Sequence, residues 1–149
     1  MECKYGSHCV YQIRYHMVMC IKYRKKMLDR PGYSEKLADL INGIGERYEF
    51  EIEELGTDGD HIHVFVGASG RWAPSNIMKV LKSISAREMF QTFPEIRKQL
   101  WGGEFWSDGG YIGTVGEGTT VEIVRKYIRE QGSTETHGSY RQMDLFRKG

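Results

Sequence analysis

The amino-acid sequence predicts one domain of the α+β class, an antiparallel sheet with helices on one face. Two spacings of apolar side chains support this prediction. Some stretches alternate apolar and polar residues, as strands do, and others repeat apolar residues every three or four positions, as helices do. The stretches follow one another in the order strand, helix, strand, strand, helix, strand, helix.

The first half of the chain contains three predicted strands and one helix. Residues 10–24 are rich in Val, Ile and Tyr and alternate in part, so they predict a strand. After a Pro-Gly-Tyr turn, Ser34 is placed to cap a helix with correctly spaced apolar residues. These are Leu37, Leu40, Ile41 and Ile44. Residues 49–56 and 61–67 predict two strands joined by the hairpin sequence GTDGD.

The second half supplies another strand and two helices. Ser75 opens a helix with apolar residues at Ile77, Val80, Leu81 and Ile84. Residues 111–115 predict a strand, and Thr119 with Glu122 forms a capping box that begins a third helix. Residues 132–149 have the composition of a flexible tail. The first six elements match a ferredoxin-like β-α-β-β-α-β sheet, and the C-terminal helix is an addition to it.

Length and composition restrict the class of protein. A chain of 149 residues is long enough for one domain with its own core. No stretch reaches the roughly 20 apolar residues of a membrane span, and no signal peptide is visible. The three cysteines are an odd number without a C-x-x-C pair, which favours reduced thiols over a disulfide scaffold or a zinc finger. We therefore expect a cytoplasmic protein with no membrane association.

Charge is distributed unevenly along the chain. Residues 46–60 contain seven acids and one base, so the rest of a chain of net charge +1 carries a charge of +7. Its bases gather in residues 22–26, in the predicted second helix and in residues 125–129. Such clusters are often only solvated faces, but three of them apart from one acidic stretch favour a phosphate-binding surface. The candidate DNA contacts are Arg24, Lys25, Lys79 and Lys82.

The sequence GDHIHVFVG contains the first candidate site. In a strand over residues 61–67, His61 and His63 share one face, ~6.5–7 Å apart, and the opposite face is apolar. Two neighbouring imidazoles can share a metal ion, although such a pair can also be a hydrogen-bonded surface feature. The adjacent Asp60 and the apolar opposite face favour a functional pair.

The predicted third helix contains the second candidate. Val121, Val124 and Ile128 form its apolar stripe. Tyr127 and Gln131 are four residues apart and so are neighbours at the edge of that stripe. We expect Tyr127 to lean against the protein body, although on the helix alone an ordinary boundary tyrosine is the favoured explanation.

Five blocks of sequence then resemble a known family. They are YHMVMCIKYRKK, DHIHVFV, LKSISAREMF, LWGGEFWSDGGYIGTVG and VRKYIREQG. In this order, from about residue 8 to residue 132, they resemble the single-tyrosine HUH (His-hydrophobic-His) transposases of small bacterial insertion sequences. The H-x-H alone is a weak signal, whereas the ordered set is specific. The resemblance identifies residues 1–149 as one HUH transposase domain.

The resemblance implies an activity and assigns roles by position. Such enzymes bind DNA hairpins near the ends of their element and cut single-stranded DNA through a 5′-phosphotyrosine intermediate. By position, Tyr127 is the nucleophile, and His61, His63 and Gln131 are the metal ligands. The implied cofactor is Mg²⁺ or Mn²⁺, although imidazole ligands usually favour zinc, nickel or copper. The family also implies a homodimer whose active sites are shared between chains.

Three alternatives remain at the level of sequence. A related HUH nuclease could act on chromosomal repeat hairpins or on replication origins. A non-catalytic single-stranded nucleic-acid-binding module could use the same fold, but it would need exposed aromatic residues where the histidines stand. A small zinc hydrolase of metabolites would leave the basic clusters and Tyr127 without a role.

Overall fold

The architecture follows from a computed structural model, which describes residues 4–5, 10–11, 13–114 and 129–130. The strands are β1 (Lys4–Tyr5), β2 (Val10–Tyr11), β3 (Arg14–Cys20), β4 (Glu51–Asp58), β5 (His61–Gly67) and β6 (Tyr111–Thr114), and the helices are α1 (Tyr33–Tyr48) and α2 (Pro74–Thr92). Short 3-10 helices lie at Lys22–Arg24, Met27–Asp29, Pro94–Lys98 and Trp101–Gly103. No helix in these parts of the chain is long and apolar enough to cross a membrane.

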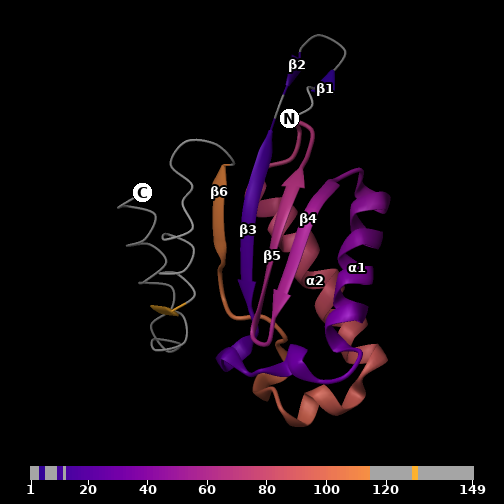
Figure 1. Ribbon diagram of the computed structural model, residues 1–149, viewed down its shortest axis with the longest axis vertical. Helices are drawn as coiled ribbons and strands as arrows, with labels where there is room; N and C mark the ends of the chain where they lie inside the picture. The colour runs from indigo at the N-terminus through magenta and orange to yellow at the C-terminus, as the bar shows by residue number, and fades with distance from the viewer. Residues whose placement is uncertain (1–3, 6–9, 12, 115–128, 131–149) are drawn as a thin grey trace.

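The main sheet has four antiparallel strands in the order β4-β5-β3-β6 (Figure 1). Together with α1 and α2, these strands give the order strand, helix, strand, strand, helix, strand, so the predicted α+β fold is confirmed. The small hairpin of β1 and β2 extends beyond one end of this sheet (Figure 1).

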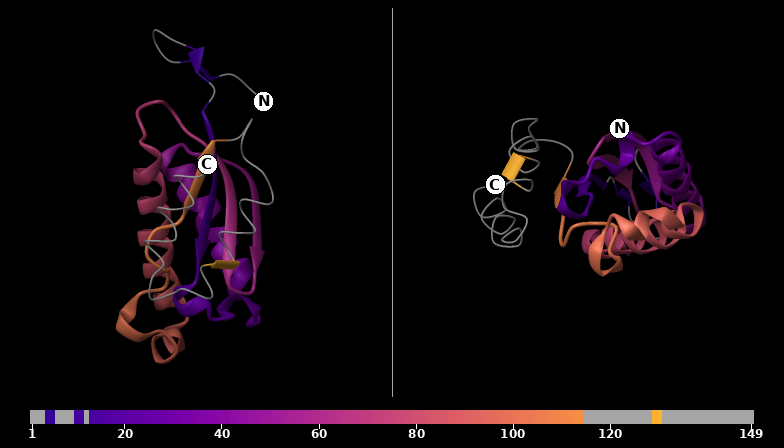
Figure 2. Two further views of the ribbon diagram at one scale, coloured as in Figure 1. Left: turned by 90° about the vertical axis from the view of Figure 1, so that its left-hand side faces the viewer. Right: turned by 90° about the horizontal axis from the view of Figure 1, so that it is seen from below.

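Both long helices cover the same face of the sheet (Figure 2). The residues buried between the layers are apolar, and they come from alternate positions of the strands and from one side of each helix. They include Met17, Met19, Ile62, Val64, Val66, Leu37, Ile41, Ile77 and Leu81, all fully buried. Burying one face this completely fixes the strand register, because a slip of one residue would turn every core side chain outward.

The opposite face of the sheet carries the two histidines. Paired residues of antiparallel strands lie on the same face. Cys20, Val18 and His16 of β3 lie opposite His61, His63 and Phe65 of β5. The side chains of His61 and His63 are half-buried, so the predicted alternation along β5 is confirmed.

A bulge in β4 decides which residue faces the second histidine. The register shifts between Ile52 and Glu54, so one extra residue lies in β4. Because of this residue, Leu55 is directed towards the core face and Gly56 lies opposite His63. Bulges often re-aim side chains beside functional sites. The sequence pattern gave no prediction of this bulge.

The predicted first strand over residues 10–24 is wrong at both ends. Val10–Tyr11 is the separate strand β2, which pairs with β1, and the main-sheet strand β3 begins only at Arg14. It ends at Cys20, and Lys22–Arg24 forms a 3-10 helix instead. The amide of Ile21 donates to the carbonyl of Asp60, 2.8 Å away, and that of Lys22 to the carbonyl of Phe105, 2.9 Å away. These bonds turn the chain away from the sheet.

Other predicted boundaries differ by one or two residues. Ser34 does not cap α1, because Gly32, with a φ of 82°, precedes its first residue. The second helix begins at Pro74 rather than at Ser75. Strand β4 begins two residues after the predicted residue 49, since Glu49, with a φ of 61°, ends α1. The capping box of the predicted third helix and the predicted tail, residues 132–149, lie outside the described residues.

Candidate metal and DNA site

His61 is held by the carboxylate that precedes it. The Nδ1 of His61 donates to Oδ1 of Asp60 over 2.8 Å. An ionised carboxylate only accepts hydrogen bonds, so the proton is on Nδ1 and Nε2 keeps its lone pair. A carboxylate partner of this kind fixes the orientation of a metal-binding imidazole.

Asp60 is itself buried and held by a cation. Its Oδ2 accepts from Nε of Arg24 over 2.8 Å, and the ammonium of Lys26 lies 3.9 Å from the same oxygen. Burial alone would raise the pKa of Asp60, but the hydrogen bonds from His61 and Arg24 and the nearby cations lower it below its usual value. The carboxylate therefore stays charged and keeps both partners in place.

The ring of His63 lies over a glycine. Gly56 is opposite His63 across β4 and β5, and a Cβ added to it would lie 2.5 Å from Cε1 of His63, with Nε2 closer still. Any larger residue would displace the ring. Burial, and then the neighbouring His61, lower the pKa of His63, so the imidazole is neutral over a wider pH range. A neutral imidazole is the form that binds metal.

A third histidine packs beside the pair. The ring of His16 lies edge-on to His63, with centroids 5.8 Å apart, and stacks on Phe65 at 4.3 Å. Its Nε2 is buried without a hydrogen-bond partner in the described part of the chain. Burial and the nearby His63 lower the pKa of His16. The packing is that of a structural residue.

The chemistry of these residues fits a divalent metal ion. His61 offers Nε2, and Gly56 leaves room for the ring of His63. Among the described residues, no group of three or more His, Cys, Asp or Glu side chains is arranged to hold a metal ion. The third predicted ligand, Gln131, and the predicted nucleophile, Tyr127, lie outside the described residues, so their predicted roles remain untested.

The four candidate DNA contacts have different surroundings. Lys25 and Lys79 are exposed. Arg24 is bonded to Asp60, as described above. Lys82 is half-buried and donates to the carbonyls of Ser107 and Gly109, 2.7 and 2.6 Å away.

Lys82 therefore ties the segment before β6 to α2. Burial lowers its pKa. Lys79 and Lys82 also line an apolar groove of about 850 Å³ between α2 and residues 103–112. The two lysines thus share a surface, but Lys79 is exposed, whereas Lys82 is half-buried with its ammonium bonded to two carbonyls.

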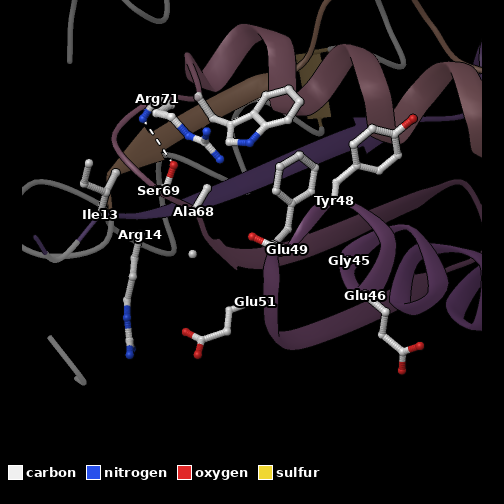
Figure 3. A pocket seen from close by; sticks show the side chains of 13 residues that line it. Ile13, Arg14, Gly45, Glu46, Tyr48, Glu49, Glu51, Ala68, Ser69 and Arg71 are labelled. Carbon is white, nitrogen blue, oxygen red and sulfur yellow. Dashed lines mark hydrogen bonds between the residues drawn. The ribbon is translucent and has the colours of Figure 1, made fainter. Parts of the chain in front are cut away.

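A second cavity lies at the other end of β5 from His61 (Figure 3). It has a volume of about 350 Å³ and is lined by aromatic and charged side chains from the end of α1 and the loop after β5. The rings of Phe50 and Trp72 meet edge to face in its wall, 4.9 Å between centroids. Since β5 spans about 20 Å, this cavity is separate from the histidine pair.

One residue that shapes the site was not singled out by sequence. Gly56 was assigned to the end of a strand and to the hairpin sequence GTDGD, although a glycine inside a strand pattern signals a bulge or a close approach. The adjacency of Asp60 was noted, but its bonds to His61 and Arg24 require knowledge of where residues 21–28 lie.

Comparisons with known proteins identify the family of the chain. The family model described as "Transposase IS200 like" matches residues 9–131. The ISDra2 transposase TnpA of Deinococcus radiodurans is 35% identical over 135 residues, which cover 91% of this chain and 95% of that protein. The transposase of insertion sequence element IS200 of Salmonella typhimurium is 27% identical over 128 residues, or 84% of this chain and 80% of that protein.

Solved structures share the fold. A crystal structure of a candidate transposase from Deinococcus radiodurans R1 has a TM-score of 0.79 and 31% identity, and the match covers 86% of this chain and 97% of that one. A REP-associated tyrosine transposase bound to a REP hairpin has a TM-score of 0.51 and 13% identity, covering 89% and 74%. The resemblance found in the sequence is thus confirmed, and the chain belongs to the IS200-like family of single-tyrosine HUH transposases.

Proposed function

We propose that this transposase is a metal-dependent single-strand DNA endonuclease and strand transferase that recognises hairpins at the ends of its element. Tyr127 is the nucleophile and forms a 5′-phosphotyrosine intermediate. His61, His63 and Gln131 bind a divalent metal ion, Mg²⁺ or Mn²⁺. The active protein is a homodimer with shared sites.

One observation carries this proposal within the described residues. His61 and His63 lie side by side on the sheet face that α1 and α2 leave uncovered, and Asp60 orients His61 with its Nε2 lone pair available. A nucleic-acid-binding module without catalysis has no use for a histidine oriented in this way. Tyr127 and Gln131 are assigned their roles from the resemblance of the sequence to the family, whose model matches residues 9–131.

In the proposed cleavage step, each bond that forms is matched by a bond that breaks, and the protons balance. The phenol oxygen of Tyr127 attacks the phosphorus, the bond from phosphorus to the 3′ oxygen breaks, and the phenol proton is lost as the 3′ oxygen gains one. One phosphate ester replaces another, so a DNA hydroxyl can reverse the step without ATP. Asp60 and Arg24 hold His61 in place throughout.

A bound divalent metal ion would polarise the scissile phosphate, which matters because phenol has a pKa of about 10 and is a poor nucleophile near neutral pH. His61 and His63 would hold it from the sheet and Gln131 from the C-terminal segment. Metal binding is therefore expected to affect cleavage far more than hairpin recognition.

The ends of an insertion sequence are the favoured substrate. The relative with 35% identity is an insertion-sequence transposase that matches nearly its whole length. The solved neighbour bound to a REP hairpin has the same fold at 13% identity, so this fold can accommodate a DNA hairpin. Action on chromosomal repeats is the alternative, and imperfect palindromes flanking the gene would decide between the two.

The nucleophile is tested by trapping the covalent intermediate. Wild-type protein, metal and hairpin-bearing single-stranded DNA should give an adduct that survives denaturation. Tyr127→Phe should give none, whereas Tyr140→Phe, the same change elsewhere in the C-terminal segment, should react normally. An adduct with Tyr127→Phe would show that the nucleophile is another residue.

Sharing of sites between chains is tested by mixing two inactive proteins. His61→Ala and Tyr127→Phe are combined under conditions that permit subunit exchange. If the histidines of one chain act with the tyrosine of the other, heterodimers contain one intact composite site and cleavage returns at a fraction of the wild-type rate. If each site is built within one chain, every site keeps one lesion and no cleavage returns.

A further inference from the structure

The segment after β3 is held at both ends and bends outward between them. The amides of Ile21 and Lys22 donate to the carbonyls of Asp60 and Phe105, and the amide of Leu28 donates to the carbonyl of Gly59, 2.9 Å away. Residues 23–26 lie between these anchors. The segment is therefore fixed against the turn that precedes His61.

Two consecutive residues of this segment have a strained backbone. Tyr23 has a φ of 60° and Arg24 a φ of 50°, a region that residues other than glycine rarely adopt. Such strain persists only where the surrounding structure imposes it, and it is concentrated at functional sites. Glycine would make the same turn without strain, so the tyrosine side chain calls for a reason of its own.

The side chain of Tyr23 does not contribute to the core. It is 46% exposed and is the only large hydrophobic side chain exposed in the described part of the chain. The other tyrosines that the structure places near the sheet, such as Tyr15 and Tyr111, are buried. Core packing thus fails to explain Tyr23.

A lysine lies near this ring, and the next residue connects the segment to the histidine site. The ammonium of Lys22 lies 5.5 Å from its centroid, and Lys25 and Lys26 follow in the sequence with exposed side chains. The next residue, Arg24, is bonded to Asp60, which is bonded to His61. A rigid chain of contacts therefore fixes the backbone of Tyr23 relative to a proposed metal ligand.

We propose that Tyr23 is a stacking platform for an unpaired base of the single-stranded DNA beside the scissile phosphate. This inference rests on the proposed function and names the part of the substrate that this corner of the site binds. An exposed aromatic ring next to ammonium groups is the arrangement with which proteins hold single strands, because every base has a π-face and the cations contact the phosphates. The strained turn presents the ring to solvent, and the bonds to Asp60 keep it in register with His61.

The experiment compares two probes of equal charge, a short oligothymidylate and an abasic oligonucleotide of the same length. The wild type should bind the oligothymidylate about 5- to 150-fold more tightly, the range for stacking on one base. Tyr23→Phe should keep this preference, and Tyr23→Gly should lose most of it while affinity for the abasic strand stays the same. Because glycine adopts a positive φ without strain, Tyr23→Gly should unfold at an equal or higher temperature.

Three results would overturn the platform. They are a wild type without base preference, a Tyr23→Gly variant that keeps the preference, and a Tyr23→Gly variant with a clearly lower unfolding temperature. The Tyr127 adduct is measured in parallel. If the wild type forms the adduct but Tyr23→Gly keeps the preference for oligothymidylate, only the base platform is refuted. If Tyr23→Gly loses this preference but the wild type forms no adduct, the platform stands and the proposed nuclease activity is refuted.

Discussion

Replacing Gly56 by alanine should disable the histidine pair while leaving the fold intact. Gly56 has no positive φ, so alanine fits its backbone. The added methyl carbon would lie 2.5 Å from Cε1 of His63, whereas ordinary contact begins near 3.4 Å. The imidazole must therefore withdraw by about 1 Å, and a displacement of that size in a reacting group can cost about 100-fold in rate.

The expected effect is larger on metal binding than on stability. A half-buried ring can rotate away, and alanine restricts the unfolded chain, so the free energy of unfolding should change by no more than about 1 kcal/mol. Affinity for Mn²⁺ should fall by about 10- to 100-fold, or about 1.4–2.7 kcal/mol, as when the support of a metal ligand is removed.

The assay is a titration with Mn²⁺ of wild-type and variant protein, combined with single-strand cleavage and hairpin binding. Gly43→Ala is the matched control, because Gly43 lies in α1 on the other side of the sheet and nothing lies within 4 Å of its added Cβ. This control should bind Mn²⁺ normally and gain about 0.8–1 kcal/mol of stability from helix propensity. Unchanged Mn²⁺ affinity and cleavage in Gly56→Ala would refute the argument that His63 must lie over a glycine.

Further expected outcomes concern charge and buried polar groups. Asp60→Asn should lower Mn²⁺ affinity about 10- to 100-fold without abolishing hairpin binding, and equal losses of both would contradict an orienting role. Because burial lowers the pKa of His16 and His63, the folded protein binds fewer protons than the unfolded chain below about pH 6.5. Urea unfolding should therefore show stability falling as pH decreases from about 6.5, and His16→Phe should weaken this fall and add about 1 kcal/mol at neutral pH by removing an unpartnered buried nitrogen. Lys79→Met should reduce the log–log salt slope of DNA binding by about 0.7–0.9, whereas Lys82→Met should chiefly cost about 1–3 kcal/mol of stability, since its ammonium serves two carbonyls.

The sequence predicted those features that repeat along a single element. Alternation along residues 61–67 placed His61 and His63 on the face opposite Val64, and β5 has those bounds. The spacing of Ile77 and Leu81 likewise predicted the buried side of α2. Such patterns are local, because each depends only on the geometry of one strand or helix.

Structural features that arise where two distant segments of the chain pack together could not be predicted from the sequence. The bulge in β4 brings Gly56, and not Leu55, opposite His63, and the sequence of either strand alone does not reveal that register. Lys82 was predicted to contact DNA because it lies in a cluster of basic residues on the second helix. Its ammonium is instead bonded to carbonyls 25 and 27 residues further along the chain. The strand expected over residues 10–24 also ends early because of distant segments. The amides of residues 21 and 22 donate hydrogen bonds to the carbonyls of Asp60 and Phe105 rather than to a neighbouring strand.

Asp60 links the separate parts of the site into one unit. Its carbonyl accepts the amide of Ile21, one carboxylate oxygen holds Arg24, and the other holds His61. The turn between β4 and β5 therefore sets the positions of His61, the proposed metal ligand, and of the strained segment after β3 at the same time. Any displacement of this turn would move His61 and Tyr23 together, so the proposed metal site and the proposed base platform keep their relative geometry. The proposed cleavage at a defined nucleotide would require that constancy, because the stacked base would decide which phosphate reaches the histidines.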